Sequence, residues 1–229
     1  LTELLETRKR AEWNAEFEPD AQEEFEKVIK HELHPESGYL KMGEVIRKVS
    51  EATNNDAVLV TDVGQNQMMG VRYFQYNHTR SVVTSGGLGT MGFGLPAAIG
   101  AKFGAPERTV CFFTGDGGLQ MTIQELGTIM QEQIDVKIIL LNNNFLGMVR
   151  QWQELFFHER YSFTEMVNPD FVSIAKAYGI AAREVQKREE LDEAIQEMVN
   201  HKGAYLLVAD VERFEMVYPM VPAGATVTN

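Results

Sequence analysis

Two polar stretches, each placed directly after an apolar run, have the chemistry of a metal and phosphate site. Residues 114–118 (Thr-Gly-Asp-Gly-Gly) offer the Asp116 carboxylate, and residues 142–144 (three asparagines) offer the Asn143 amide oxygen. Mg²⁺ prefers such hard oxygen ligands and completes its coordination shell with phosphate and water. The glycine pair after Asp116 would open a helix, where free N–H groups favour an anion. We therefore predict a magnesium–diphosphate site.

Two neighbouring strands are needed to bring these side chains together. Residues 109–113 and 136–141 are mostly β-branched, aromatic or leucine, which predicts buried parallel strands. The stretch 119–133 between them has helix-forming composition and no proline, so we expect a βαβ unit. Open parallel sheets bind ligands at the carboxyl ends of their strands. A lone Gly-Asp-Gly is usually a turn, and an asparagine run is usually a solvated loop. Their shared position at two strand ends favours the site.

The rest of the chain alternates strand and helix patterns, which predicts a doubly wound, mainly parallel α/β sheet flanked by helices. We expect a charged helical arm or linker over 1–37, the diphosphate-binding domain over 38–211 and a tail over 212–229. Other expected strands are 57–63, 82–84, 179–185 (at an edge) and 205–211, and other expected helices are 20–31, 43–52, 68–74, 95–103, 145–157, 168–178 and 189–200.

Composition restricts the classes of function. The chain has 229 residues and a net charge of −12, which argues against a nucleic-acid or anionic-membrane partner. Its single cysteine, Cys111, lies in a predicted core strand and fits a reducing compartment, so we expect a cytoplasmic protein. No stretch has the length and apolarity of a transmembrane helix, and no signal-peptide pattern opens the chain. Because the first residue is Leu1, we expect a fragment of a longer polypeptide.

A second glycine-rich stretch offers a different interpretation. Residues 87–92 match G-x-G-x-x-G between a predicted strand and a predicted helix, which is the pattern of a dinucleotide site. The ribose-binding acid of such a site would have to be Asp116, which already has its own glycine pair and helix start. These glycines are alternatively explained by a tight path of the chain.

The stretches 115–117 and 142–143 resemble the thiamin diphosphate (ThDP) motif. From about residue 39 to 224, the chain resembles the C-terminal ThDP-binding domain of the acetohydroxyacid synthase (acetolactate synthase) large catalytic subunit. The stretches that carry this resemblance are 62–65, 85–92, 115–117, 142–143, 147–153 and 218–222.

The resemblance implies bound ThDP and Mg²⁺, with the metal held by the Asp116 carboxylate, the Asn143 amide oxygen and the Phe145 carbonyl. Residues implied to contact the diphosphate are Gln65, Asn66, Gly117, Gly118 and Gly147. Residues implied to face the rest of the cofactor are Gly89, Met91 and Met148, and Trp152 would shape the pocket for the second 2-ketoacid. The family usually has histidine where this chain has Asn66, which can donate a hydrogen bond but cannot carry a positive charge.

The implied reaction is decarboxylation of pyruvate and condensation with pyruvate or 2-ketobutyrate, in the biosynthesis of valine, leucine and isoleucine. The activating glutamate and the FAD-binding domain of the family match nothing here, so we expect weak cofactor binding and no turnover by this chain alone. A homodimer or larger assembly and a small regulatory subunit are implied partners. The alternatives are pyruvate oxidase, a 2-ketoacid decarboxylase, or a non-catalytic binding or assembly module. The stretch 150–153 argues against the first two.

Overall fold

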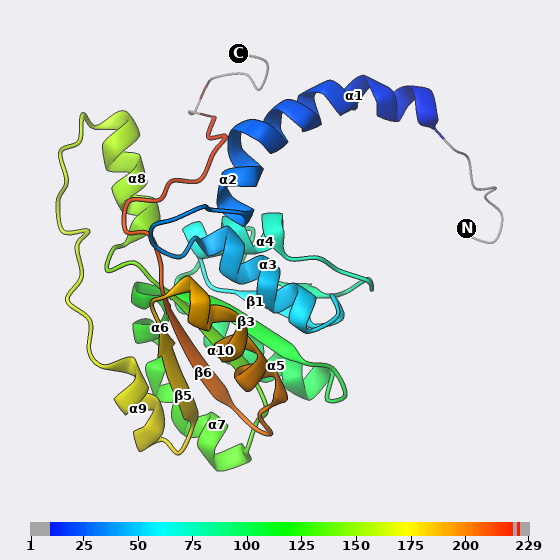
Figure 1. Cartoon of the computed structure of the whole chain (residues 1–229). Helices are drawn as coiled ribbons and strands as arrows, with labels where there is room; N and C mark the ends of the chain where they lie inside the picture. Colours follow the sequence, from blue (N-terminus) through cyan, green and yellow to red (C-terminus); the bar gives the residue numbers. More distant parts are fainter. Residues whose placement is uncertain (1–9, 222–223, 225–229) are drawn as a thin grey trace.

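The sheet of this protein is six-stranded and wholly parallel. The computed structural model describes residues 10–221 and 224. The strands are β1 (Val58–Thr61), β2 (Val82–Val83), β3 (Val110–Gly115), β4 (Lys137–Asn142), β5 (Ala181–Val185) and β6 (Tyr205–Asp210). Their order is β2-β1-β3-β4-β6-β5, so β5 is an edge strand as predicted. The predicted fold class, a doubly wound parallel α/β sheet, is confirmed (Figure 1).

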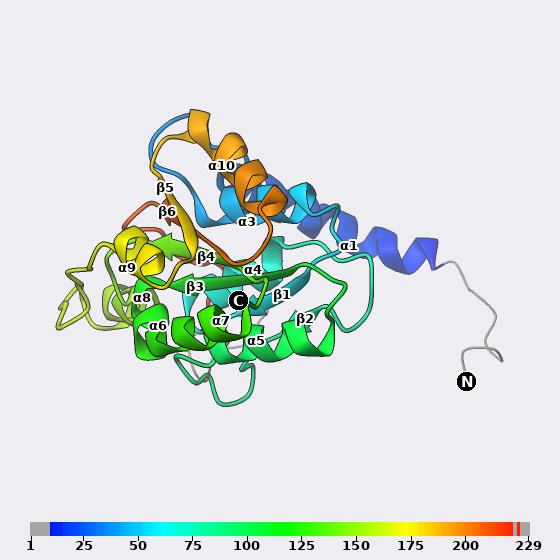
Figure 2. The ribbon, with the colours of Figure 1, turned by 90° about the horizontal axis from the view of Figure 1, so that it is seen from below.

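Helices cover both faces of the sheet because its central strands are apolar on both sides. In β3, Cys111 and Phe113 face one hydrophobic cluster, whereas Val110 and Phe112 face the other. The first cluster is covered by α3 (Met42–Ala52), α4 (Gln65–Tyr73) and α10 (Arg188–Asn200). The second is covered by α5 (Gly94–Gly104), α7 (Leu126–Glu132) and α9 (Phe171–Ala177). Figure 2 shows α3 and α10 on one side of the sheet and α5 and α7 on the other.

The predicted helix over 119–133 is wrong as a single element. Helix α6 (Asp116–Met121) ends early, a short 3₁₀ turn follows over Ile123–Glu125, and α7 then begins. Thr122 leaves the helical conformation at φ −133°, and its hydroxyl donates to the Gly92 carbonyl at 3.0 Å. A β-branched residue with a tertiary hydrogen bond thus breaks a segment of helix-forming composition. The remaining predicted elements of the sheet and its covering helices agree within three residues of their bounds.

The described part of the N-terminal arm is one nearly continuous helical rod. Helix α1 (Ala11–Glu24) continues through a π-helical turn, Phe25–Ile29, into α2 (Lys30–Leu33), and the rod extends away from the sheet (Figure 1). The second helical stretch expected over 20–31 is therefore part of this rod, and Pro19 is accommodated inside α1. No residue of α1 is buried, and Trp13 packs edge-on against Phe17 at 5.0 Å between ring centroids.

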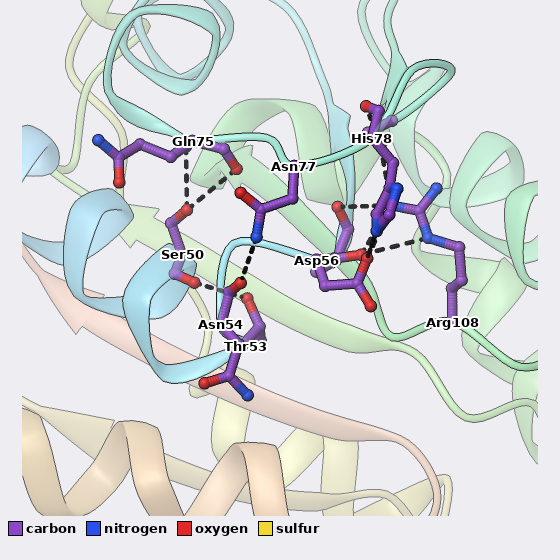
Figure 3. Close-up of polar contacts among 10 residues, drawn as sticks. Ser50, Thr53, Asn54, Asp56, Gln75, Asn77, His78 and Arg108 are labelled. Atoms are coloured by element: carbon purple, nitrogen blue, oxygen red, sulfur yellow. Dashed lines mark hydrogen bonds and ion pairs between the residues drawn. The ribbon is translucent and has the colours of Figure 1, made fainter.

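A network of polar contacts links the loops at the amino ends of the strands, away from the site described below. The Gln75 N–H donates to the Ser50 hydroxyl at 2.9 Å, which ties the loop after α4 to the end of α3. Arg108 donates to the Asp56 carbonyl at 2.7 Å, and His78 Nε2 lies 3.2 Å from the Asp56 carboxylate (Figure 3). These contacts fix where β1 and β3 begin. Across the described residues, no helix has the length and hydrophobicity to cross a membrane.

Candidate cofactor site at the strand ends

A cavity of about 220 Å³ opens at the carboxyl ends of β1, β3 and β4. Its wall contains all eleven residues that the sequence analysis assigned to cofactor binding, namely Gln65, Asn66, Gly89, Met91, Asp116, Gly117, Gly118, Asn143, Phe145, Gly147 and Met148. The other lining residues are mainly apolar, and they include Val63, Leu146 and Val149. The cavity therefore joins a polar end, at the strand tips, to an apolar remainder.

Asp116 is the first residue of α6 and directly follows β3. Its side chain is almost fully buried, with 1% of the residue exposed. One carboxylate oxygen accepts from the Gly117 N–H at 3.1 Å, and the other accepts from Asn168 Nδ2 at 2.6 Å. Burial raises the pKa of the Asp116 carboxyl, and the hydrogen bonds from Asn168 and Gly117 act in the opposite direction. A buried carboxylate with so few protein donors is suited to bind a cation.

Asn143 follows β4 and lies in the same cavity wall. Its Oδ1 accepts from the Phe145 N–H at 3.1 Å, and its Nδ2 lies 3.5 Å from Gln65 Oε1. Between Asn143 and Phe145, Asn144 adopts a left-handed backbone conformation at φ 58°, which asparagine tolerates well. Asn143 and Phe145 thus line the same cavity as Asp116, and an amide oxygen and a backbone carbonyl are ligand types suited to a hard cation.

Two glycines in the wall are required by close packing. A Cβ atom on Gly117 would lie 2.6 Å from a Leu146 methyl carbon. A Cβ atom on Gly147 would lie 2.1 Å from Gln65 Oε1 and 3.0 Å from Asn143 Nδ2. The backbone therefore approaches the polar side chains more closely than any larger residue permits.

Asn66 leaves a buried acceptor in the cavity wall. Its Nδ2 donates to the Val63 carbonyl at 2.9 Å, and its Oδ1 has no hydrogen-bond partner among the described residues. The residue is 5% exposed. A buried unpaired oxygen is costly, so a ligand or a metal-bound water that donates to it fits this position.

The glycine-rich loop is anchored by Asp62, a residue to which the sequence analysis assigned no role in the site. Its buried carboxylate accepts from the Gly92 N–H at 3.1 Å, the Gly94 N–H at 3.0 Å and the Val63 N–H at 2.9 Å. The amides that a dinucleotide pyrophosphate would need are thus occupied. This geometry argues against the dinucleotide interpretation of residues 87–92. An acid at the end of an apolar strand, with a glycine two residues later, was the available signal.

Gln65 is held by residues that the sequence analysis did not place in the site. Its Nε2 donates to Gln151 Oε1 at 2.9 Å and to the Glu215 carbonyl at 2.8 Å. Gln151 is fully buried on α8 (Gly147–Phe156) and exchanges two hydrogen bonds with the Val217 backbone, at 2.8 and 2.9 Å. The C-terminal segment therefore sets the orientation of Gln65. A glutamine on a helix carries no local signal of such a role.

Trp152 lies on α8 but is not in the cavity wall formed by the described residues. It is 39% exposed and packs on Phe156 with 4.6 Å between ring centroids. Among the described residues, no three His, Cys, Asp or Glu side chains converge as a metal cluster. A metal in the cavity would therefore depend on amide and carbonyl oxygens in addition to Asp116.

A parallel sheet with a buried carboxylate, an amide and close-packed glycines at adjoining strand tips defines an α/β domain that binds a cofactor at the carboxyl ends of its strands. Sequence comparison shows to which family of such domains the chain belongs. The chain belongs to the thiamine pyrophosphate enzyme family, C-terminal TPP binding domain, whose model matches residues 62–209. Thiamine pyrophosphate is another name for ThDP.

Similar curated proteins are acetolactate synthases. The chain is 45% identical over 183 residues to the isozyme 2 large subunit of Escherichia coli, covering 80% of this chain and 33% of that protein. It is 41% identical over 230 residues to the E. coli isozyme 1 large subunit, covering 100% and 40%. It is 38% identical over 229 residues to the mitochondrial catalytic subunit of Saccharomyces cerevisiae, covering 98% and 33%. The chain thus spans roughly a third of the length of these relatives.

A solved structure also matches the fold. The thiamine diphosphate-dependent 4-hydroxybenzoylformate decarboxylase of Rhodococcus jostii RHA1 superimposes with a TM-score of 0.71 and 26% sequence identity. The match covers 77% of this chain and 33% of the decarboxylase.

Proposed function

We propose that this chain is the Mg²⁺–ThDP-binding part of an acetolactate synthase. In the proposed reaction, pyruvate is decarboxylated and its two-carbon unit is joined to pyruvate or 2-ketobutyrate. The observation that carries the proposal is the convergence of Asp116 and Asn143, from two neighbouring strand tips, on one partly apolar cavity. Identities of 38–48% to acetolactate synthases support the choice of reaction.

The residues present fit the cofactor. The Asp116 carboxylate, the Asn143 amide oxygen and the Phe145 carbonyl would hold Mg²⁺, and Gln65 with the glycine backbone would contact the diphosphate. The unpaired Asn66 oxygen is available to a metal-bound water. When bound, ThDP supplies the electron sink that lets a 2-ketoacid lose CO₂.

The apolar part of the wall would hold the organic rings of the cofactor and exclude water. Met91 and Met148 are flexible, polarizable side chains that adapt to an irregular ring surface. The exposed indole of Trp152, on the helix that carries Met148, would extend the binding surface for the second 2-ketoacid.

The proposed activity is expected to need residues beyond the stretch that the chain matches in its relatives. We propose that the activating glutamate and an FAD-binding domain lie in the two-thirds of the relatives that the chain does not match. We propose also a homodimeric or larger assembly, a small regulatory subunit and a cytoplasmic location. The chain alone is then expected to bind cofactor weakly and to form no acetolactate.

A ThDP-dependent 2-ketoacid decarboxylase is the second candidate, favoured by the fold match to the Rhodococcus enzyme. The identity to that enzyme is 26%, against 45% to the E. coli isozyme 2 large subunit, and the difference supports the synthase. In the full-length protein, release of an aldehyde from pyruvate without acetolactate would establish the decarboxylase.

Calorimetric titration of the chain with ThDP in excess Mg²⁺ tests the proposal. We expect saturable heat that disappears with EDTA. For Asp116→Ala, we expect a loss beyond the roughly 10–100-fold that removal of an outer-shell partner costs. Asp170→Ala is the control, since this exposed residue caps α9 outside the cavity. No heat with the wild-type chain at millimolar ThDP would favour a non-catalytic module.

A further inference from the structure

Asn168 contacts Asp116 from outside the cavity wall. It lies in the loop before α9, and it is not in the cavity wall formed by the described residues. Its Nδ2 lies 2.6 Å from Asp116 Oδ2, the shorter of the two hydrogen bonds to that carboxylate. The contact therefore reaches the carboxylate without occupying the space where a ligand would sit.

The orientation of the Asn168 amide is determined by its neighbours. An ionised carboxylate only accepts, so Asn168 must turn its NH₂ group toward Asp116. The same NH₂ group donates to Asn142 Oδ1 at 2.9 Å, and Asn168 Oδ1 accepts from Gln120 Nε2 at 3.1 Å. Turning the amide over would lose all three bonds.

The network is fixed at its far end by a second carboxylate. Asn142 ends β4 and pairs in register with Asp210, which ends β6. Asn142 Nδ2 donates to Asp210 Oδ1 at 2.9 Å, so its Oδ1 is left to face Asn168. Three neighbouring strand tips, those of β3, β4 and β6, are thereby joined in one chain of hydrogen bonds that ends on Asp116.

We propose that Asn168 is a positioning residue for the metal ligand Asp116. This inference rests on the magnesium site of the proposed function, and it adds a residue outside the two strand-end motifs to that site. Asn168 holds one carboxylate oxygen and fixes the rotation of the carboxylate plane, which leaves the remaining lone pairs directed at the cation. Outer-shell partners of metal ligands orient them in this way, and their loss costs roughly 10–100-fold in metal affinity.

The test measures Mg²⁺ affinity of the full 229-residue chain by calorimetry at saturating ThDP, for Asn168→Ala and Asn168→Leu. Alanine leaves room for a water that can donate to Asp116, whereas leucine fills the space without a donor. We expect at least a tenfold loss for alanine and a larger loss for leucine. A residue needed only to fill space would show the reverse order, because leucine restores packing. Asp170→Ala, two residues away, is the control: we expect a lower melting temperature from the lost helix cap and unchanged Mg²⁺ affinity.

The outcomes separate the inference from the proposed function. If the wild-type chain binds neither ThDP nor Mg²⁺, the proposed function fails. If the wild type binds and both Asn168 variants bind equally well, only the positioning role is refuted. Should a variant not fold, the side-chain amide resonance of Asn168 in the wild-type protein decides. It must shift on adding Mg²⁺ and ThDP, while that of Asn77, hydrogen-bonded at the opposite end of the sheet, stays in place. An unmoved Asn168 resonance would overturn the inference.

Discussion

Gly147→Ala is expected to damage the stability of the domain and its cofactor site together. The new methyl group would lie 2.1 Å from Gln65 Oε1. Because Gln65 is buried, its side chain can yield only by giving up its hydrogen bonds to Gln151 and Glu215. Each is worth about 1 kcal/mol, and overpacking of a tight wall adds about 1–3 kcal/mol. We expect a loss of roughly 3–5 kcal/mol in the free energy of unfolding.

The measurement is urea unfolding of the cofactor-free chain, with thermal unfolding as a second method. At about 2–4 °C per kcal/mol for a domain of this size, the melting temperature should fall by roughly 6–20 °C. The matched control is Gly100→Ala in α5, where the added methyl would meet nothing within 4 Å. Alanine is favoured over glycine in a helix, so this control should be stabilised by roughly 0.5–1 kcal/mol. If both variants change stability alike, the close approach at Gly147 has been misjudged.

Three further predictions use other buried groups. Burial raises the pKa of the Cys111 thiol to about 12, so a thiol reagent at pH 8 should modify it in urea but not in the native protein; equal rates would contradict this. Burial, and then the neighbouring Glu32, raise the pKa of Glu215 well above its usual value. The folded state then binds more protons than the unfolded state, and stability is lost as the pH rises above about 4.5. Glu215→Gln should therefore raise the melting temperature more at pH 8 than at pH 5. An equal change at both pH values would show that the pKa of Glu215 is not raised. Gly94→Ala would place a methyl group 2.2 Å from the Phe112 ring, so we expect a loss of at least about 1–3 kcal/mol in urea unfolding; wild-type stability would exclude the clash.

The shared position of Asp116 and Asn143 in the candidate site could be predicted because both follow apolar strands. The strands 109–113 and 136–141 were evident from their composition, and parallel pairing then brings Asp116 and Asn143 to one edge of the sheet. The positions of Met91 and Met148 in the cavity wall came from the family resemblance instead, since a methionine carries no local sign of its function.

The supporting residues could not be predicted in the same way. Asn168 and Gln151 act through contacts to residues 52 and 86 positions away, and their local sequences suit a solvated turn and an ordinary helix. The break at Thr122 also depends on a contact, its hydrogen bond to the Gly92 carbonyl. Periodicity describes which face of an element is buried, but it does not show which polar side chain meets which partner.

Attempts to redesign this cofactor pocket will have to treat distant glycines as one unit. The Asp62 carboxylate holds the amides of Gly92 and Gly94, and its Oδ1, which accepts from the Gly92 N–H, would lie 2.6 Å from a Cβ atom on Gly118. A side chain at position 118 would therefore push on the carboxylate that holds the other glycine stretch. Mutant libraries that vary one loop at a time would then recover few folded variants, whereas libraries that vary position 62 together with both loops could find compensating pairs.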